Sequence, residues 1–286
     1  MATAHPQSGL LPMASPQRDV AVGLASTDIL VASVDLDFGG REHTETATQF
    51  RLGVTETPFR VDVEHKGVEI TGPHLVRLHE IGDRIGSRIE GAVRSTWVVL
   101  SGRFLEDVTR HTPFWRSPFA KPFIAPPLPI LGEVHRFLAR AKAGVNPFWA
   151  EEQLATLLPQ LLEHTSDSAP RTRRPPTAGM RRLARDTDAL LGSDFSRVET
   201  LTMLAKRLGV SASYLARAYR AATGRTLHGR IAQLRLAEAL RRLAAGATDL
   251  TALALELGYS SHSHFTAEFR RHLGVPPSRF RLNTQI

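Results

Sequence analysis

The spacing of apolar side chains divides the sequence into a strand-like first half and a helical second half. Between residues 28 and 104, the sequence has short strand-like stretches, which are residues 29–36, 60–64, 68–70, 74–81 and 96–100. Residues 60–64 and 74–81 alternate in side-chain character, which is the period of half-buried β-strands. The second and third of the five stretches flank three turn residues and predict a β-hairpin, and residues 101–104 are expected to form a turn and a returning strand. Short strands at such intervals predict a small β-barrel or sandwich.

A helical period begins after the proline-rich passage 112–129. One amphipathic helix is predicted to end at Gly144, and a second to begin at Pro147 with Asn146 as its N-cap. The apolar side chains are Val134, Phe137, Leu138 and Ala141 in the first helix and Leu154, Leu157, Leu158, Leu161 and Leu162 in the second. Pro159 falls inside the second pattern and is expected to kink or shorten it. Such a helical pair can cover the core of a β-domain.

The last third of the sequence predicts two helix-turn-helix units joined by a long helix over residues 227–245. In the first unit, Gly209 makes the turn and Ser211 is a suitable N-cap for the second helix. In the second unit, residues 250–257 precede a turn at Gly258. A further helix over residues 180–191 is expected to break at 192–194. The inward side chains of the first unit are Leu201, Leu204, Ala205, Leu208, Leu215, Ala218, Tyr219 and Ala222. Those of the long helix are Ile231, Leu234, Ala237 and Leu240, and those of the second unit are Phe265, Phe269 and Leu273. The last helix of the second unit is predicted to end at Gly274, Pro276 and Pro277.

The outward faces of the second helix in each unit carry small polar side chains and arginines. That combination suits the major groove of DNA, where small groups allow close approach and arginine binds guanine or phosphate. Arg217 is the best candidate for base contact, and Arg220 and Arg270 for phosphate contact. At ~1.5 Å per residue the long helix spans just under ~30 Å, comparable with the ~34 Å helical repeat, so one chain can address two successive grooves. The candidate DNA-binding residues are Ser211, Ser213, Tyr214, Ala216, Arg217, Arg220, Ser261, His262, Ser263, Thr266, Ala267 and Arg270.

The stretch from 198 to 281 resembles the DNA-binding domain of the AraC/XylS family of bacterial transcription regulators. The resemblance implies binding to double-stranded promoter DNA, an interaction with RNA polymerase, and an N-terminal domain that senses a signal or mediates dimerisation. It also implies that a helical pair contributes to a homodimer contact and that a small molecule acts as effector. The residues that match the family's base-contacting positions are Ser213, Ala216 and Arg217, and His262, Ser263 and Ala267.

The second unit departs from the family pattern at two places. Ala267 stands where arginine is common, and Ser261 with His262 replaces an acidic-amide pair. We therefore expect the second unit to discriminate between bases less than the first.

These patterns predict an α+β protein of two domains. A flexible tail covers residues 1–25, and a cupin-like β-domain with its helical pair covers 26–164. A linker follows at 165–178, and an all-α DNA-binding domain occupies 179–286. Charge supports this division: residues 1–170 hold 16 Lys+Arg against 20 Asp+Glu, whereas residues 171–286 hold 20 against 8. The basic half is the half expected to meet a polyanion.

Composition excludes several functions. The sequence has no cysteine, which excludes disulfides, thiolate metal sites and cysteine nucleophiles. No apolar run reaches the ~18 residues of a membrane span and no signal peptide is evident, so a cytoplasmic protein is expected.

The predictions include no cofactor, no catalytic residue and no metal. The histidines of the β-domain, His43, His65, His74 and His79, lack the His-x-His followed by Glu that a cupin metal site uses. His262 and His264 diverge on their helix. Two alternatives remain for the first domain: a protein-interaction module with no small-molecule ligand, or a cupin-like enzyme fused to a DNA-binding domain. Against the enzyme, no nucleophile-elbow, phosphate-loop or metalloprotease motif is found.

Overall fold

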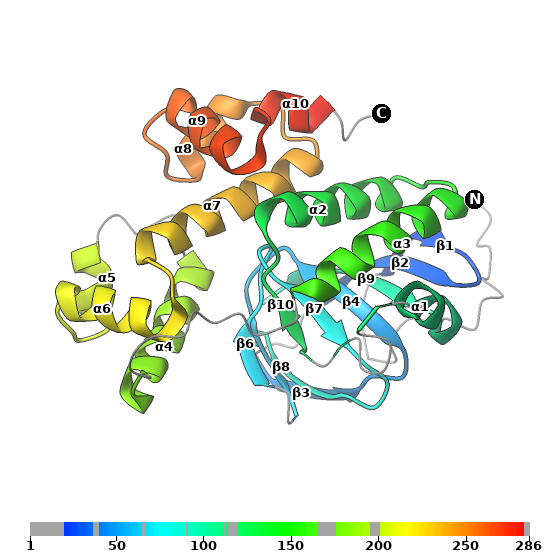
Figure 1. The fold of residues 1–286 in the computed structure, drawn as a ribbon, viewed down its shortest axis with the longest axis horizontal. Helices are drawn as coiled ribbons and strands as arrows, with labels where there is room; N and C mark the ends of the chain where they lie inside the picture. Colours follow the sequence, from blue (N-terminus) through cyan, green and yellow to red (C-terminus); the bar gives the residue numbers. More distant parts are fainter. Residues whose placement is uncertain are drawn as a thin grey trace. The chain divides into compact units, whose positions relative to one another are not determined.

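The computed structural model describes residues 20–36, 40–64, 67–89, 91–110, 112–113, 119, 121–164, 176–194 and 201–282. The chain divides into two compact units, Met1–Ser166 and Asp167–Ile286 (Figure 1). The first unit contains all of the described strands and the second is helical. This is the α+β organisation that the sequence predicts. Most of the predicted linker, residues 165–175, lies outside the described residues.

Two antiparallel sheets form the N-terminal unit. The larger has the order β1 (Val20–Ala25), β2 (Ile29–Leu36), β9 (Val93–Leu100), β4 (Phe50–Thr55), β7 (Val76–His79) and β10 (Phe123–Ile124). The smaller has the order β3 (Glu42–Thr46), β8 (Arg84–Arg88), β5 (Arg60–Val63) and β6 (Gly67–Ile70). The β5–β6 pair is the predicted hairpin. Both sheets are open, so of the two predicted forms the sandwich is confirmed and a closed barrel is not.

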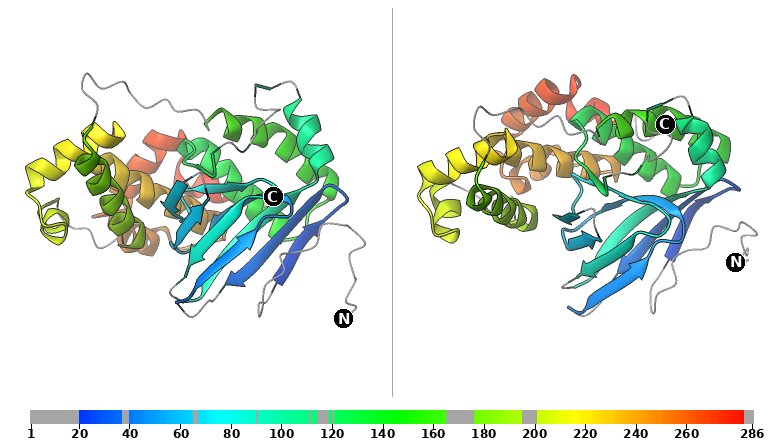
Figure 2. Two further views of the ribbon diagram at one scale, coloured as in Figure 1. Left: turned by 90° about the horizontal axis from the view of Figure 1, so that it is seen from below. Right: turned by 60° about the horizontal axis from the view of Figure 1, so that its bottom comes forward.

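The two faces of the larger sheet have different neighbours. One face packs on the smaller sheet, where Trp97 and Val34 meet Val61 and Ile85 in one apolar cluster. The other face is covered by three helices, α1 (Gly102–Thr109), α2 (Leu128–Lys142) and α3 (Pro147–Glu163), as Figure 2 shows. Asn146 caps α3 as predicted, accepting from the Phe148 backbone N–H at 2.9 Å. The helix runs on through Pro159, so the expected shortening is wrong.

Two further local expectations fail in this unit. Residues 101–104 begin α1 instead of a returning strand, because the Ser101 side chain accepts from the Phe104 backbone N–H at 3.1 Å and starts a helix. Val20–Ala25 is strand β1, not tail, because its backbone pairs with β2 although most of its side chains are exposed. The rest of the predicted tail, residues 1–19, lies outside the described residues.

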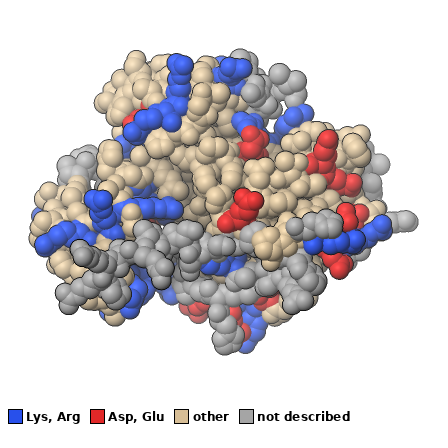
Figure 3. All heavy atoms as spheres, in the orientation of Figure 1, with Lys and Arg blue, Asp and Glu red and all other residues tan. Residues whose placement is uncertain are grey.

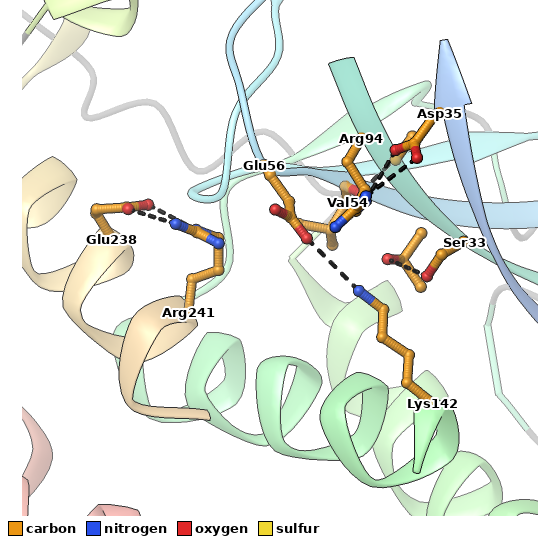
Figure 4. Close-up of polar contacts among 10 residues, drawn as sticks. Ser33, Asp35, Val54, Glu56, Arg94, Lys142, Glu238 and Arg241 are labelled. Atoms are coloured by element: carbon orange, nitrogen blue, oxygen red, sulfur yellow. Dashed lines mark hydrogen bonds and ion pairs between the residues drawn. The ribbon is translucent and has the colours of Figure 1, made fainter. Parts of the chain in front are cut away.

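Close contacts fix α2 against the sheet. Gly23 lies in a bulge of β1, and a Cβ there would come within 2.6 Å of the Ala141 carbonyl oxygen, so only glycine allows this approach. At the end of α2, Lys142 Nζ lies 3.6 Å from the Glu56 carboxylate (Figure 4). Both of these side chains are about a third exposed, so the ion pair adds little stability.

The C-terminal unit consists of seven helices within the described residues. They are α4 (Ala178–Asp194), α5 (Leu201–Arg207), α6 (Ala212–Thr223), α7 (Leu227–Ala244), α8 (Leu250–Glu256), α9 (His262–Leu273) and α10 (Pro277–Leu282). The long helix α7 connects the two helix-turn-helix pairs, as predicted (Figure 1). The expected break at 192–194 is absent, since α4 continues to Asp194. Within the described parts of the chain, no helix is long and apolar enough to cross a membrane.

Candidate nucleic-acid interface

The first helix-turn-helix consists of α5, a turn at Gly209 and α6. Gly209 has a φ of 67°, a left-handed conformation that glycine adopts without strain. Ser211 then caps α6, because its side chain accepts from the Tyr214 backbone N–H at 3.3 Å. The predicted turn and cap are therefore both confirmed.

The inward faces of α5 and α6 pack against α4 and α7. Leu204, Leu215 and Tyr219 are buried in one cluster with Ala184 and Leu191 of α4. Leu201, which was expected to point inward, is 39% exposed at the first position of α5. Helix α5 has only seven residues, and its buried side chains are Leu204 and Ala205. Leu201 continues the apolar spacing of the helix but lies beyond the part that packs on the core.

A buried polar network fixes the orientation of α6. The Oδ1 atom of Asp188 on α4 accepts from the Tyr219 hydroxyl at 2.8 Å and from Nε of Arg230 on α7 at 3.0 Å. Burial, with the nearby Asp188 charge, raises the pKa of Tyr219, so the hydroxyl stays protonated and donates. This network could not be predicted from the sequence, because its members are far apart along the chain and an Asp or Arg on a helix is usually exposed.

The outward face of α6 exposes the predicted residues. Ser213, Arg217 and Arg220 are exposed and Ala216 is half-buried, while Ser211 and Tyr214 are exposed at the helix start. In the described part of the chain, neither Arg217 nor Arg220 has a side-chain hydrogen bond or ion pair. Neighbouring Arg225, by contrast, donates to Gln233 at 3.1 Å. The two guanidinium groups are therefore available to an external anion.

The second helix-turn-helix repeats this local design. Asp249 caps α8, accepting from two backbone N–H groups at 2.9 Å each. Gly258 makes the turn with a φ of 80°. Ser261 caps α9, accepting from the His264 backbone N–H at 3.1 Å. Each of these local features follows from capping and turn preferences in the sequence.

An aromatic cluster forms the inward side of α9. Phe265 and Phe269 are fully buried with ring centroids 5.6 Å apart. Tyr259 lies 5.2 Å from Phe265, and Phe280 of α10 lies 5.9 Å from Phe269. The contribution of Phe280 was missed, because the prolines before it were expected to end the helix and no later helix was predicted, whereas Pro277 starts a further short helix.

The outward side of α9 is an open hollow. It is lined by His262, Ser263, Thr266, Ala267, Arg270 and Arg271. Five of these residues were predicted to contact DNA, and the helix brings them together. Arg270 has no side-chain partner among the described residues, whereas Arg271 pairs with Glu268 at 2.8 Å. Of the described cations on this face, Arg270 is therefore the free one.

The two outward faces correspond position by position. Both helices have twelve residues, a serine N-cap and a left-handed glycine C-cap, Gly224 and Gly274. Counted from the serine, Arg220 and Arg270 occupy the same position. Arg217 and Ala267 also correspond, so the second face lacks the guanidinium that is the best candidate for base contact in the first.

Many other arginines of this unit are engaged locally. Figure 4 shows Arg241 bonded to Glu238, with the two hydrogen bonds at 2.7 and 2.8 Å. Arg242 pairs with Glu256, and Arg182 lies 3.8 Å from Asp186. On the face drawn in Figure 3, Lys and Arg outnumber Asp and Glu over the C-terminal unit. Arg217, Arg220 and Arg270 differ from these arginines in having no side-chain partner among the described residues.

The histidines of α9 make polar contacts along their own helix. His262 Nε2 lies 3.4 Å from the Thr266 hydroxyl, and His264 Nδ1 lies 3.2 Å from the Ser260 hydroxyl. No group of three or more His, Asp or Glu side chains suited to a metal occurs among the described residues.

Two turn-linked helix pairs, each with an exposed polar second helix, define a helix-turn-helix DNA-binding domain. A helix-turn-helix family model matches residues 204–283. The regulatory protein SoxS of Escherichia coli is 31% identical over 100 residues, which are 35% of this chain and 94% of SoxS. The chain belongs to the AraC/XylS family of transcription regulators.

Other relatives share only part of their length with this chain. The invasion protein InvF of Salmonella typhi is 34% identical over 80 residues, 28% of this chain and 37% of InvF. A putative AraC-like transcription regulator of Streptomyces lividans is 34% identical over 91 residues, 32% of this chain and 30% of that protein. Among solved structures, ToxT of Vibrio cholerae has a TM-score of 0.37 at 11% identity, covering 90% of this chain and 98% of ToxT.

Proposed function

We propose that this protein is a sequence-specific DNA-binding transcription regulator that activates promoters by recruiting or positioning RNA polymerase. Its N-terminal unit senses a signal or mediates dimerisation, and so alters how two DNA-binding units are held. The observation that carries the DNA-binding part is that the exposed guanidinium groups of Arg217, Arg220 and Arg270 on the two outward faces have no partner among the described residues. Activation, polymerase contact and dimerisation are carried over from the family.

The geometry of the two faces supports double-stranded DNA as the partner. Small side chains such as Ser213 and Ser263 let each helix approach the base edges closely, and the arginines provide the bidentate donors that guanine or phosphate accepts. The 18 residues of α7 span ~27 Å, close to one turn of B-DNA. One chain would thus contact two successive stretches of major groove.

The test is DNA binding by the full-length protein to a site selected from a random library. If about 6 to 10 phosphates are contacted, affinity falls ~10³ to 10⁵-fold between 50 and 200 mM salt. The triple variant Arg217→Ala, Arg220→Ala, Arg270→Ala is expected to lose binding. Arg182→Gln is a matched control, since Arg182 is an exposed arginine of the same unit that lies on α4 and not on α6 or α9. No enrichment of any sequence, or an affinity independent of salt, would refute the proposal.

A further inference from the structure

The interior of the β-sandwich contains charged side chains. Along β4 and β7, Leu52 and Leu78 belong to the core beneath the helices, so the alternate residues Arg51 and Arg77 point toward the smaller sheet. Arg51 is 4% exposed and Arg77 is 2% exposed. The inner face of a sandwich is ordinarily apolar, and a buried charge is costly unless it is paired.

The ring of Trp97 on β9 holds both guanidinium groups. Its centroid lies 4.6 Å from Cζ of Arg51 and 4.0 Å from Cζ of Arg77. Phe59 lies over Arg77 as well, at 5.2 Å. Gly53 lies beneath the tryptophan, where a Cβ would come within 2.5 Å of the ring. Because aromatic rings cover the faces of the guanidinium groups, their N–H edges are left for hydrogen bonding.

The charges in this cluster do not balance. Arg51 pairs with Glu45 at 2.5 Å. Arg77 donates to the neutral Ser95 hydroxyl at 2.5 Å and pairs with no carboxylate of the described residues. Burial, and then repulsion from Arg51, lowers the pKa of Arg77 to about 9, against the attraction of Glu45. Counted over the residues that the structure describes, the cluster therefore carries one excess positive charge.

The unsatisfied groups in this cluster identify the kind of partner that is missing. Nε of Arg51, Nε of Arg77 and Nε1 of Trp97 are buried and have no hydrogen-bond acceptor. All three are donors only. Three donors and an excess positive charge at one place call for an anionic group with more than one acceptor oxygen.

We propose that the sandwich interior at Arg51, Arg77 and Trp97 binds the carboxylate of a small-molecule effector. This rests on the proposed function, in which the N-terminal unit senses a signal. The carboxylate accepts hydrogen bonds from the N–H groups of Arg77, which has no anionic partner among the described residues, and from Nε of Arg51. The nonpolar part of the molecule contacts the rings of Trp97 and Phe59. Effector binding would thereby neutralise the sandwich interior and stabilise it.

The test is the melting temperature of the full-length protein with butyrate, hexanoate, benzoate or phenylacetate, each compared with its uncharged amide at equal ionic strength. At least one acid should raise Tm by about 2 to 8 °C at saturating concentration, and its amide should not. Arg77→Met should abolish the shift while leaving the free protein at least as stable, because it replaces an unpaired buried charge. Arg77→Lys should retain part of the shift. Arg94→Met should retain all of it, since Arg94 is exposed and pairs with Asp35 at the surface (Figure 4).

The proposal is overturned if no acid shifts Tm, if amides act as strongly as acids, or if Arg77→Met keeps the shift. Chloride or phosphate giving an equal shift would also overturn it, since the site would then hold a simple anion only. DNA binding by the wild-type protein is measured separately. If a carboxylic acid raises Tm but the protein does not bind DNA, the proposed function is refuted and the carboxylate site stands. If the protein binds DNA but no acid raises Tm, only the carboxylate site is refuted.

Discussion

The hydroxyl of Tyr219 on α6 donates a 2.8 Å hydrogen bond to Asp188 on α4, a carboxylate that also holds the Arg230 guanidinium. The side chains of Arg230 and Asp188 are 9% and 25% exposed. Removing the acid would take away the carboxylate that pairs with a largely buried cation, although Arg230 would keep its 3.3 Å hydrogen bond to Gln233. Asp188→Ala is therefore expected to lower the free energy of unfolding by about 2 to 3 kcal/mol. Chemical unfolding of the full chain, followed by circular dichroism, measures this change.

Asp186→Ala is the control for that prediction. Asp186 lies two residues away on the same helix, and its pair with Arg182 is 3.8 Å long and largely exposed. Its loss should cost less than about 1 kcal/mol. Equal effects of the two variants would show that Asp188 has only a surface role.

The two buried tyrosines of this unit should respond oppositely to loss of the hydroxyl. Tyr219→Phe removes the bond to Asp188 and should cost about 1 to 2 kcal/mol. The Tyr259 hydroxyl is buried and has no hydrogen-bond partner within the described part of the chain, so Tyr259→Phe should be neutral or stabilising. The melting temperatures of the two variants, measured together, test this contrast, and a larger loss for Tyr259→Phe would contradict it.

Tyr259 also predicts a dependence on alkaline pH. Burial raises the pKa of Tyr259 to about 12, above the ~10 of an unfolded chain. The folded state therefore keeps a proton that the unfolded state releases, and this contribution to stability is present below pH ~10 and lost as the pH rises to about 12. At pH 11, wild type should lose of order 1 kcal/mol relative to Tyr259→Phe, compared with pH 8. An unchanged difference between the two proteins would refute the assignment.

Arg217 and Arg220 are predicted to have different roles on DNA. Arg217→Ala should weaken binding to the selected site by about 1 to 3 kcal/mol and have little effect on scrambled DNA, because a base contact is lost. Arg220→Ala should weaken binding to both and lower the salt slope by ~1, because a phosphate contact is lost. Competition titrations at several salt concentrations separate the two. Identical profiles would refute the assignment of Arg217 to base contact.

The second unit is expected to contribute less specificity than the first. Ala267 occupies the position that Arg217 has in α6, so the α9 face lacks that donor. An alanine scan over the outward residues of both helices, assayed on matched and scrambled sites, should show the larger specificity losses in α6. Ala267→Arg should create a new base preference in the second half of the site. The idea fails if α9 carries the larger loss in the scan.

Local chemistry was sufficient to predict much of the structure. Ser211 was recognisable as a cap, and Gly209 and Gly258 as turns, because each acts on its immediate neighbours. The same local signals placed the outward residues of α6 and α9, since helical period alone decides which side chains share a face. The family resemblance added the pairing of the two units.

What the sequence did not predict depends on contacts between distant segments. Alternation placed Arg77 and His79 on one face of a strand, yet only the position of the second sheet shows that this face is buried. Asp188 meets Arg230 only after three helices have packed. The apolar pattern of residues 20–25 is too weak to predict a strand. Strand β1 forms because its backbone pairs with β2.

The length of helix α7 determines the spacing of the DNA sequences that the protein can recognise. Inserting one residue would rotate α8 and α9 by ~100° about the helix axis and move them ~1.5 Å along it. It would also misalign the core residues Leu234, Leu236, Ala237 and Leu240, which are buried on several sides of the helix. Exchanges on the outward faces can alter base preference one position at a time. The phase between the two halves of a target site, by contrast, is set by the folded domain and cannot drift without unfolding it.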